Sequence, residues 1–166
     1  MISTYLVEHP WLTTVGLLLA VIAGPLLGYW LITRPRLATR LGLLRLLPVV
    51  ALTLVPTRRD LAVGCAAEWD FPTLGAVELM ANVMLFLPPV LLLGIALRRP
   101  FVVLFGASAT SALIEVVQAF VTALGRSCST NDWLSNTLGA ALGAAIAALA
   151  LRASRAKRDH TPPSLL

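Results

Sequence analysis

Five long apolar stretches alternate with short polar or basic segments along this chain. A bilayer core about 30 Å thick needs about 20 residues of helix, at about 1.5 Å per residue, to cross it. Each stretch is about that long, so the pattern predicts an all-α, polytopic transmembrane helix bundle of about five spans. The expected spans are Trp11–Thr33, Leu37–Val55, Val77–Leu97, Phe101–Leu124 and Trp133–Leu151.

The first two stretches each allow a second interpretation. A signal peptide would begin with basic residues and end at a small-residue cleavage site, but Glu8 and His9 are the only acidic or basic residues before the first stretch, so we expect it to span. The second stretch carries Arg40 and Arg45 in its first half and is interrupted by Pro48. Arginines near one end can reach the nearer interface, and membrane helices tolerate proline. A spanning helix and a re-entrant or interfacial segment are both compatible with it.

Composition supports a lipid-embedded chain. Hydrophobic residues make up 58% of the 166 residues and charged residues 13%, where a soluble domain has about 25% charged residues. The formal net charge is +5, but the basic residues stand in short runs between apolar stretches. Nucleic-acid binding requires a clustered basic face, so we exclude it.

The basic residues also predict the orientation of the bundle. With five spans, ten of the thirteen fall on one side and only Arg58, Arg59 and Arg126 on the other. Short cytoplasmic loops are enriched in Lys and Arg, so the N-terminus is expected outside and the C-terminus in the cytoplasm. The expected segments are two N-terminal spans (1–56), an extracellular loop (57–76), a three-span core (77–151) and a basic, disordered cytoplasmic tail (152–166). The ten residues are Arg34, Arg36, Arg40, Arg45, Arg98, Arg99, Arg152, Arg155, Lys157 and Arg158.

Polar residues of the last three spans gather at one depth, near the external face. Glu115 lies fourteen residues after Phe101, which is about 21 Å along the helix. On the fourth span, residues spaced by three and four share one face, and the third and fifth spans carry similar stripes. The candidate ligand-binding residues are Asn82, Glu115, Gln118, Arg126, Asp132 and Asn136.

An ionisable residue in a membrane costs about 2.5–3.5 kcal/mol on insertion scales, so Glu115 needs a reason to be there. We expect Arg126 to pair with it if it is charged. The other polar residues also have plain structural interpretations. The amides would join helices, Ser108 and Ser111 would bond to their own helix, and Asp132 would cap the fifth helix.

Gly139 and Gly143, four residues apart, suit close helix packing, or a seam between two copies in a homo-oligomer. Cys65 and Cys128 are both expected outside, where a disulfide is permitted; a bridge and two free thiols remain the alternatives. His9 and His160 fall on opposite sides, so we expect no metal site and no cofactor.

These residues resemble the VanZ family of bacterial membrane proteins. The resemblance covers residues 78–143, about forty per cent of the chain. It departs from the usual pattern at Pro89, where the family commonly has glycine, and over residues 127–131. Its pieces are Asn82-Val83-Met84-Leu85-Phe86-Leu87-Pro88, Ile114-Glu115-Val116-Val117-Gln118, Arg126, Asp132-Trp133-Leu134-Ser135-Asn136-Thr137-Leu138-Gly139, and Gly143.

The resemblance implies a multi-pass protein of the bacterial plasma membrane that acts at the cell envelope. Founding members are associated with resistance to teicoplanin, a lipoglycopeptide that binds peptidoglycan precursors outside the membrane. Three classes of function remain open. The protein could bind membrane lipids, a lipid-linked cell-wall precursor or a lipoglycopeptide at the outer leaflet; it could be an intramembrane enzyme using Glu115 as base with Arg126 and Asp132; or it could be a structural or transport subunit.

Overall fold

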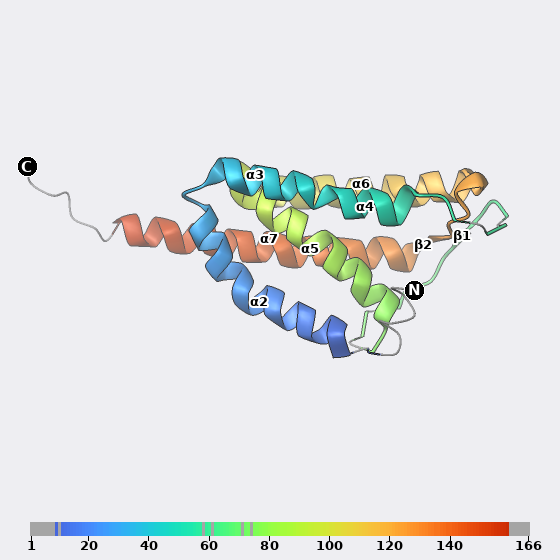
Figure 1. Ribbon diagram of the computed structural model, residues 1–166, viewed down its shortest axis with the longest axis horizontal. Coiled ribbons are helices and arrows are strands. Elements are labelled where there is room, and N and C mark those ends of the chain that lie inside the picture. Colours follow the sequence, from blue (N-terminus) through green and yellow to red (C-terminus); the bar gives the residue numbers. More distant parts are fainter. Residues whose placement is uncertain are drawn as a thin grey trace, which may run out of the picture.

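The computed structural model describes residues 9, 11–57, 59, 60, 62–70, 72, 73 and 75–159. Within these residues, five helical segments are long and apolar enough to cross a membrane, which confirms the predicted all-α bundle (Figure 1). Two short strands and one 3-10 turn connect them at one end. The elements are α2 (Trp11–Leu31), α3 (Pro35–Leu44), α4 (Leu46–Leu54), β1 (Cys65–Ala66), α5 (Val77–Leu97), α6 (Pro100–Phe120), η1 (Thr122–Leu124), β2 (Cys128–Ser129) and α7 (Thr130–Asp159).

Helix α5 is the centre of the bundle and packs most extensively against α7. Small residues allow this approach: a Cβ added to Gly139 would collide with the backbone carbonyl of Val83, and one added to Gly143 would collide with that of Leu87. Both glycines are therefore covered by α5 of the same chain and are not available as a seam for a second copy.

Two buried clusters fill the bundle, one toward each end. The first joins α2, α3, α5 and α7 around residues such as Leu31, Leu91 and Ile146. The second joins α4, α5, α6 and α7 around Val49, Phe86 and Ile114. The second cluster lies directly beneath the polar residues singled out by the sequence.

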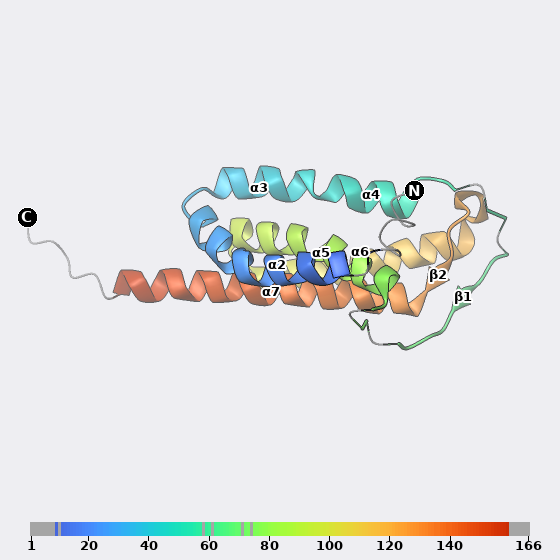
Figure 2. The same ribbon diagram turned by 60° about the horizontal axis from the view of Figure 1, so that its bottom comes forward.

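The second span consists of two helices in line, α3 and α4, separated by a turn at Arg45 (Figure 2). Pro48 has no N–H with which to reach the carbonyl of Leu44, and its ring crowds that carbonyl. The helix therefore breaks just before the proline and then resumes. Together the two pieces cover 20 residues of sufficient hydropathy, in agreement with a span.

Three predicted boundaries differ from the structure by more than two residues. The fifth span begins at Thr130 rather than at 133. The fourth span ends at Phe120 rather than at 124, because the chain turns into η1 and reaches Gly125 with φ of 59°. The tail was expected to be disordered from residue 152, yet α7 continues to Asp159. Alanine, arginine and lysine in this segment favour helix, and the first proline comes only at position 162. The remaining expected tail, residues 160–166, lies outside the described residues.

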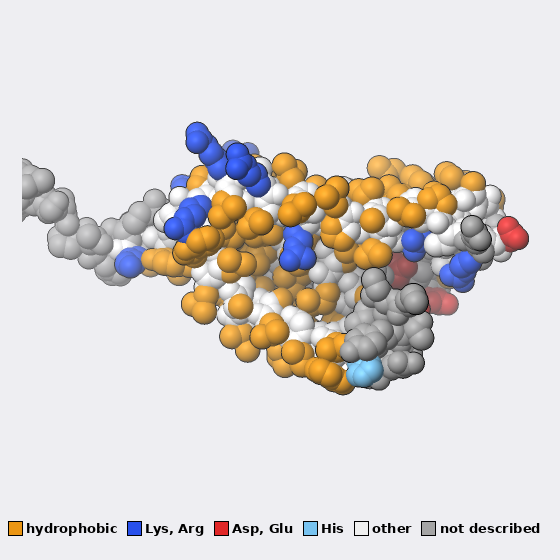
Figure 3. Space-filling model, viewed as in Figure 1, with side chains coloured by type: hydrophobic (Ala, Val, Ile, Leu, Met, Phe, Trp, Pro, Cys, Tyr) orange, Lys and Arg blue, Asp and Glu red, His pale blue; other side chains and the backbone are white. Residues whose placement is uncertain are grey.

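On the face shown in Figure 3, large apolar side chains cover the length of the bundle, whereas most of the visible Lys and Arg side chains gather toward the end from which α7 extends. Leu26 on α2 and Phe105 and Phe120 on α6 are all strongly exposed. In water such a surface would be unfavourable, but it suits the hydrocarbon of a bilayer. The visible acidic side chains lie at the opposite end, beside β1 and β2.

Candidate functional site

All six candidate residues predicted from the sequence line one polar cavity, which has a volume of about 160 Å³. The cavity lies at the end of the bundle where α4 ends and α7 begins. It receives side chains from α4, α5, α6, α7 and the two connecting segments. Its lining is Leu52, Thr53, Thr57, Arg59, Asn82, Glu115, Gln118, Arg126, Ser127, Asp132 and Asn136.

Glu115 is buried, with 7% of its surface exposed, and is bound to the start of α7. Its Oε2 accepts a hydrogen bond of 2.9 Å from the backbone N–H of Ser129. The hydroxyl of Ser129 in turn accepts the backbone N–H of Asn131 at 3.1 Å, so Ser129 is the residue that caps α7. The expectation that Asp132 caps this helix is therefore wrong, since Asp132 is the third residue of the helix and lies within its first turn.

The ion pair expected between Glu115 and Arg126 is not formed. Instead, Arg126 donates from Nε and Nη2 to the carbonyl of Val55, at 3.3 and 3.2 Å. Gln118 donates from Nε2 to the carbonyl of Thr53 at 2.8 Å. The last carbonyls of a helix have no partner within it. Two candidate residues thus bind the end of α4, and a basic group at a helix C-terminus is also favourable electrostatically.

The remaining amides connect helices. Asn82 on α5 donates to Asp132 Oδ1 on α7 at 2.7 Å, and Asn136 on α7 donates to the hydroxyl of Ser111 on α6 at 2.9 Å. Ser108 shares a hydrogen bond of 2.9 Å with Thr137. Both serines therefore bond across to α7, and the expectation that they bond to their own helix is wrong.

One buried polar atom of the cavity lining lacks a partner among the described residues. It is Oδ1 of Asn136, whose amide nitrogen already donates to Ser111. A buried carbonyl oxygen without a donor is costly, and native structures seldom keep one without a function. The Asn136 side chain is thus able to accept one further hydrogen bond.

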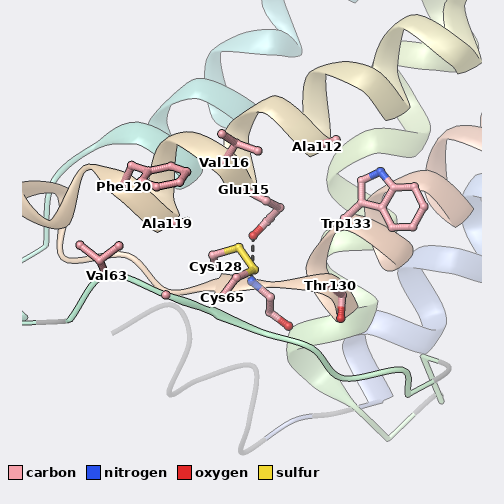
Figure 4. A pocket seen from close by; sticks show the side chains of 12 residues that line it. Val63, Cys65, Ala112, Glu115, Val116, Ala119, Phe120, Cys128, Thr130 and Trp133 are labelled. Atoms are coloured by element: carbon pink, nitrogen blue, oxygen red, sulfur yellow. Dashed lines mark hydrogen bonds between the residues drawn. A yellow bond between two sulfur atoms is a disulfide. The ribbon is translucent and has the colours of Figure 1, made fainter.

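A second cavity, of about 400 Å³, lies on the other side of Glu115 and is mostly apolar. Figure 4 shows Glu115 between Val116, Ala112 and Trp133, with Val63 and Phe120 farther along the wall. The dashed line marks its bond to Ser129. Glu115 lines both cavities, so one carboxylate stands between a small polar space and a larger apolar one.

The connection between α4 and α5 borders both cavities and is attached to the segment that precedes α7. Cys65 and Cys128 form a disulfide, with Cα atoms 4.6 Å apart, which confirms the first of the two alternatives for the cysteines. The same two residues are paired in the parallel contact of β1 with β2. Side chains at the start of α7 extend the contact: Thr130 accepts the N–H of Glu68 at 2.8 Å, and Asn131 accepts that of Asp70 at 2.8 Å.

The sequence did not reveal four residues that also offer polar groups to the cavity: Thr53, Thr57, Arg59 and Ser127. Three of them lie in connections, where helical periodicity gives no information about direction. Thr57 is held there by a hydrogen bond from its hydroxyl to the carbonyl of Gly125. The polar run Thr57-Arg58-Arg59-Asp60 that follows α4 could have drawn attention to Thr57 and Arg59, but no such signal marks Thr53 or Ser127.

Comparison with known proteins yields a family. The family model described as VanZ/LLP1 matches residues 11–151, which is most of the chain. No curated protein and no solved structure matches the chain. The match includes the whole polar cavity and all of the helices except the last eight residues of α7.

Proposed function

Because the chain belongs to the VanZ/LLP1 family, we propose that it is a bacterial plasma-membrane protein that binds a lipid-linked or lipoglycopeptide-type ligand at the outer leaflet and contributes to glycopeptide (teicoplanin) resistance. The observation that carries this proposal is the polar cavity beneath the disulfide-bonded connection, where charged and amide side chains from several elements converge.

The groups in the cavity suit a head group with both anionic and hydroxyl character. Arg126 has five N–H donors and directs two of them at Val55, which leaves three for an anion. Arg59 adds a second guanidinium to the same lining. The free Oδ1 of Asn136 would accept a hydroxyl or amide proton. A phosphate next to a sugar offers both kinds of group.

Size restricts what can enter. Pockets for drug-sized ligands usually measure about 300–1,000 Å³, and one water occupies about 30 Å³ of liquid. At about 160 Å³ the polar cavity takes only one small polar unit of a ligand. The adjoining apolar cavity of about 400 Å³ would take part of a hydrocarbon chain. This division favours a lipid-linked precursor as the ligand over an intact lipoglycopeptide.

The test combines binding and resistance. The full chain in nanodiscs is titrated with a polyprenyl phosphate, with a lipid-linked peptidoglycan precursor and with teicoplanin, while bacteria expressing the same variants are grown on teicoplanin. In Glu115→Gln and Asn136→Ala we expect binding of the polyprenyl compounds to weaken about tenfold, the effect of losing roughly one hydrogen bond, and resistance to fall. Asp60→Asn, which removes an exposed carboxylate outside the cavity, should change neither.

The outcomes separate the function classes. Unchanged binding and growth in both cavity variants would contradict the proposal and favour a structural or transport subunit. Normal binding with abolished resistance in Glu115→Gln would instead favour an enzyme that uses this carboxylate as a base.

A further inference from the structure

A third cavity, of about 340 Å³, lies at the opposite end of the bundle from the polar cavity. It is formed by the tight turn between α5 and α6 and by the segment of α7 from Ala148 to Arg155. Arg98 and Arg99 come from the turn, and Arg152 and Arg155 from α7. Four guanidinium groups from two separate segments therefore border one space.

No acidic side chain that the structure describes balances this charge. None of the described residues that line the cavity is acidic, and none of the four arginines forms an ion pair with a side chain that the structure describes. Four like charges around one space repel one another unless an anion lies between them. Guanidinium groups bind phosphate well because their planar forks match its oxygens.

The backbone of the turn adds to this preference for an anion. Helix α6 begins at Pro100, so its first free amides belong to Phe101 and Val102, and both residues line the cavity. The first amides of a helix have no partner within it and attract negative charge. Arg98 has a φ of 54°, a left-handed conformation normally given to glycine at a helix end. An arginine therefore stands at a position where its backbone is strained.

The wall of the cavity that turns away from the bundle is apolar and exposed. Phe101 is 57% and Val102 is 62% exposed, and Phe105 continues the same surface one turn along α6. A ligand whose anionic group lies among the arginines would place an attached hydrocarbon chain along these side chains. Because such apolar side chains suit the hydrocarbon of a bilayer, a lipid can bring its anionic group to the arginines while its acyl chain stays among the other lipid chains.

We propose that this cavity binds the phosphate head group of an anionic phospholipid, with an acyl chain lying along α6 beside Phe101. The site is independent of the polar cavity and of the function proposed for it. If the basic end faces the cytoplasm, the bound lipid belongs to the inner leaflet. The same phosphate chemistry is offered by free inorganic phosphate and pyrophosphate, so the experiment must distinguish these sources.

The experiment measures lipid retained by the full chain. Protein in nanodiscs of phosphatidylcholine with a minor fraction of phosphatidylglycerol is released into detergent, and the bound lipid is counted by native mass spectrometry. We expect phosphatidylglycerol to be enriched on the wild type. In Arg152→Gln/Arg155→Gln its affinity should fall at least about tenfold. Arg152→Lys/Arg155→Lys keeps both positive charges on the same helix and should retain most of the lipid binding.

Arg36→Gln/Arg40→Gln is the matched control, because it removes two exposed arginines from a helix at the same end but outside the cavity. It should retain the lipid. Equal loss in this control, or no loss in the cavity variant, would overturn the proposal. Displacement of phosphatidylglycerol by millimolar pyrophosphate, together with unchanged retention in Phe101→Ala, would assign the site to a soluble anion and would also overturn it.

Discussion

The carboxylate of Glu115 on α6 accepts the backbone amide of Ser129, the residue that caps α7. In an ordinary capping box, that amide is bound by an acidic or amide side chain three residues into the same helix. Here the residue at that position is Asp132, and it binds Asn82 on α5 instead. The start of α7 is thus fixed by two other helices, and Glu115 has a structural role in addition to any role in ligand binding.

Replacing Glu115 with alanine should lower the free energy of unfolding by about 1–3 kcal/mol, because the partly buried amide of Ser129 loses its acceptor. Glu115→Gln keeps a side-chain oxygen as the acceptor and should lower the free energy of unfolding by less. Thermal or denaturant unfolding in detergent measures the difference. Val116→Ala, at the neighbouring and exposed position, is the control. Equal stability of Glu115→Ala and the wild type would contradict the role given to this hydrogen bond.

Gly139→Ala and Gly143→Ala should each destabilise the bundle by about 1–3 kcal/mol or more, because the new methyl group meets the backbone of α5. Gly106 is the matched control. It also lies within a helix, but a Cβ there has no neighbour within 4 Å, so Gly106→Ala should be neutral or slightly stabilising. Unfolding temperatures of the three variants test the packing. A loss of stability in Gly106→Ala alone would contradict the close packing of α7 against α5 at Gly139 and Gly143.

Ser111→Ala should cost about 1–2 kcal/mol, since the buried amide of Asn136 loses the hydroxyl to which it donates. The adjacent Thr110 provides the comparison, because it is exposed and its hydroxyl bonds only to its own helix, at Gly106. Thr110→Ala should therefore change the stability by a few tenths of a kcal/mol at most. Unfolding curves that fail to separate the two variants would show that the α6–α7 hydrogen bond contributes nothing.

The disulfide predicts a specific pattern of alkylation. The unfolded but unreduced chain should take up no thiol reagent, and the reduced chain should take up two equivalents, as read by mass spectrometry. Cys65→Ala/Cys128→Ala should lower the stability by about 2–4 kcal/mol, because the bridge closes a loop over a sequence separation of 63. A protease should also cleave the connection between α4 and α5 faster in this variant than in the wild type. Alkylation before reduction would contradict the bridge.

The orientation of the bundle is a prediction from its basic residues and is open to a direct test. Alkaline phosphatase fused after Ala66 should be active, because export is required for its folding, whereas a fusion at the C-terminus should be inactive. Green fluorescent protein at the C-terminus should fluoresce. The reverse pattern would invert the bundle in the membrane and would place the polar cavity at the inner leaflet.

The amino-acid sequence predicts the helices and the gathering of polar residues well, for a physical reason. Spans are set by hydropathy, and depth along a helix follows from counting residues, so the sequence alone places Asn82, Glu115 and Asn136 at one level. Hydrogen-bond partners could not be predicted in this way. Arg126 binds Val55 rather than Glu115 because the end of α4 offers free carbonyls, and the direction of that end depends on the break near Pro48.

Beyond its junction with α3, helix α4 packs mainly against α5 and α6 and makes few contacts there, whereas α5 and α7 approach each other closely at Gly139 and Gly143. The far end of α4 is held by hydrogen bonds from Gln118 and Arg126 to its last carbonyls. The wall of the polar cavity that α5 and α7 form is therefore rigid, whereas the wall that α4 forms can move more easily. A ligand too large for the polar cavity would gain room most easily by displacing α4 outward, which would break the hydrogen bonds from Gln118 and Arg126.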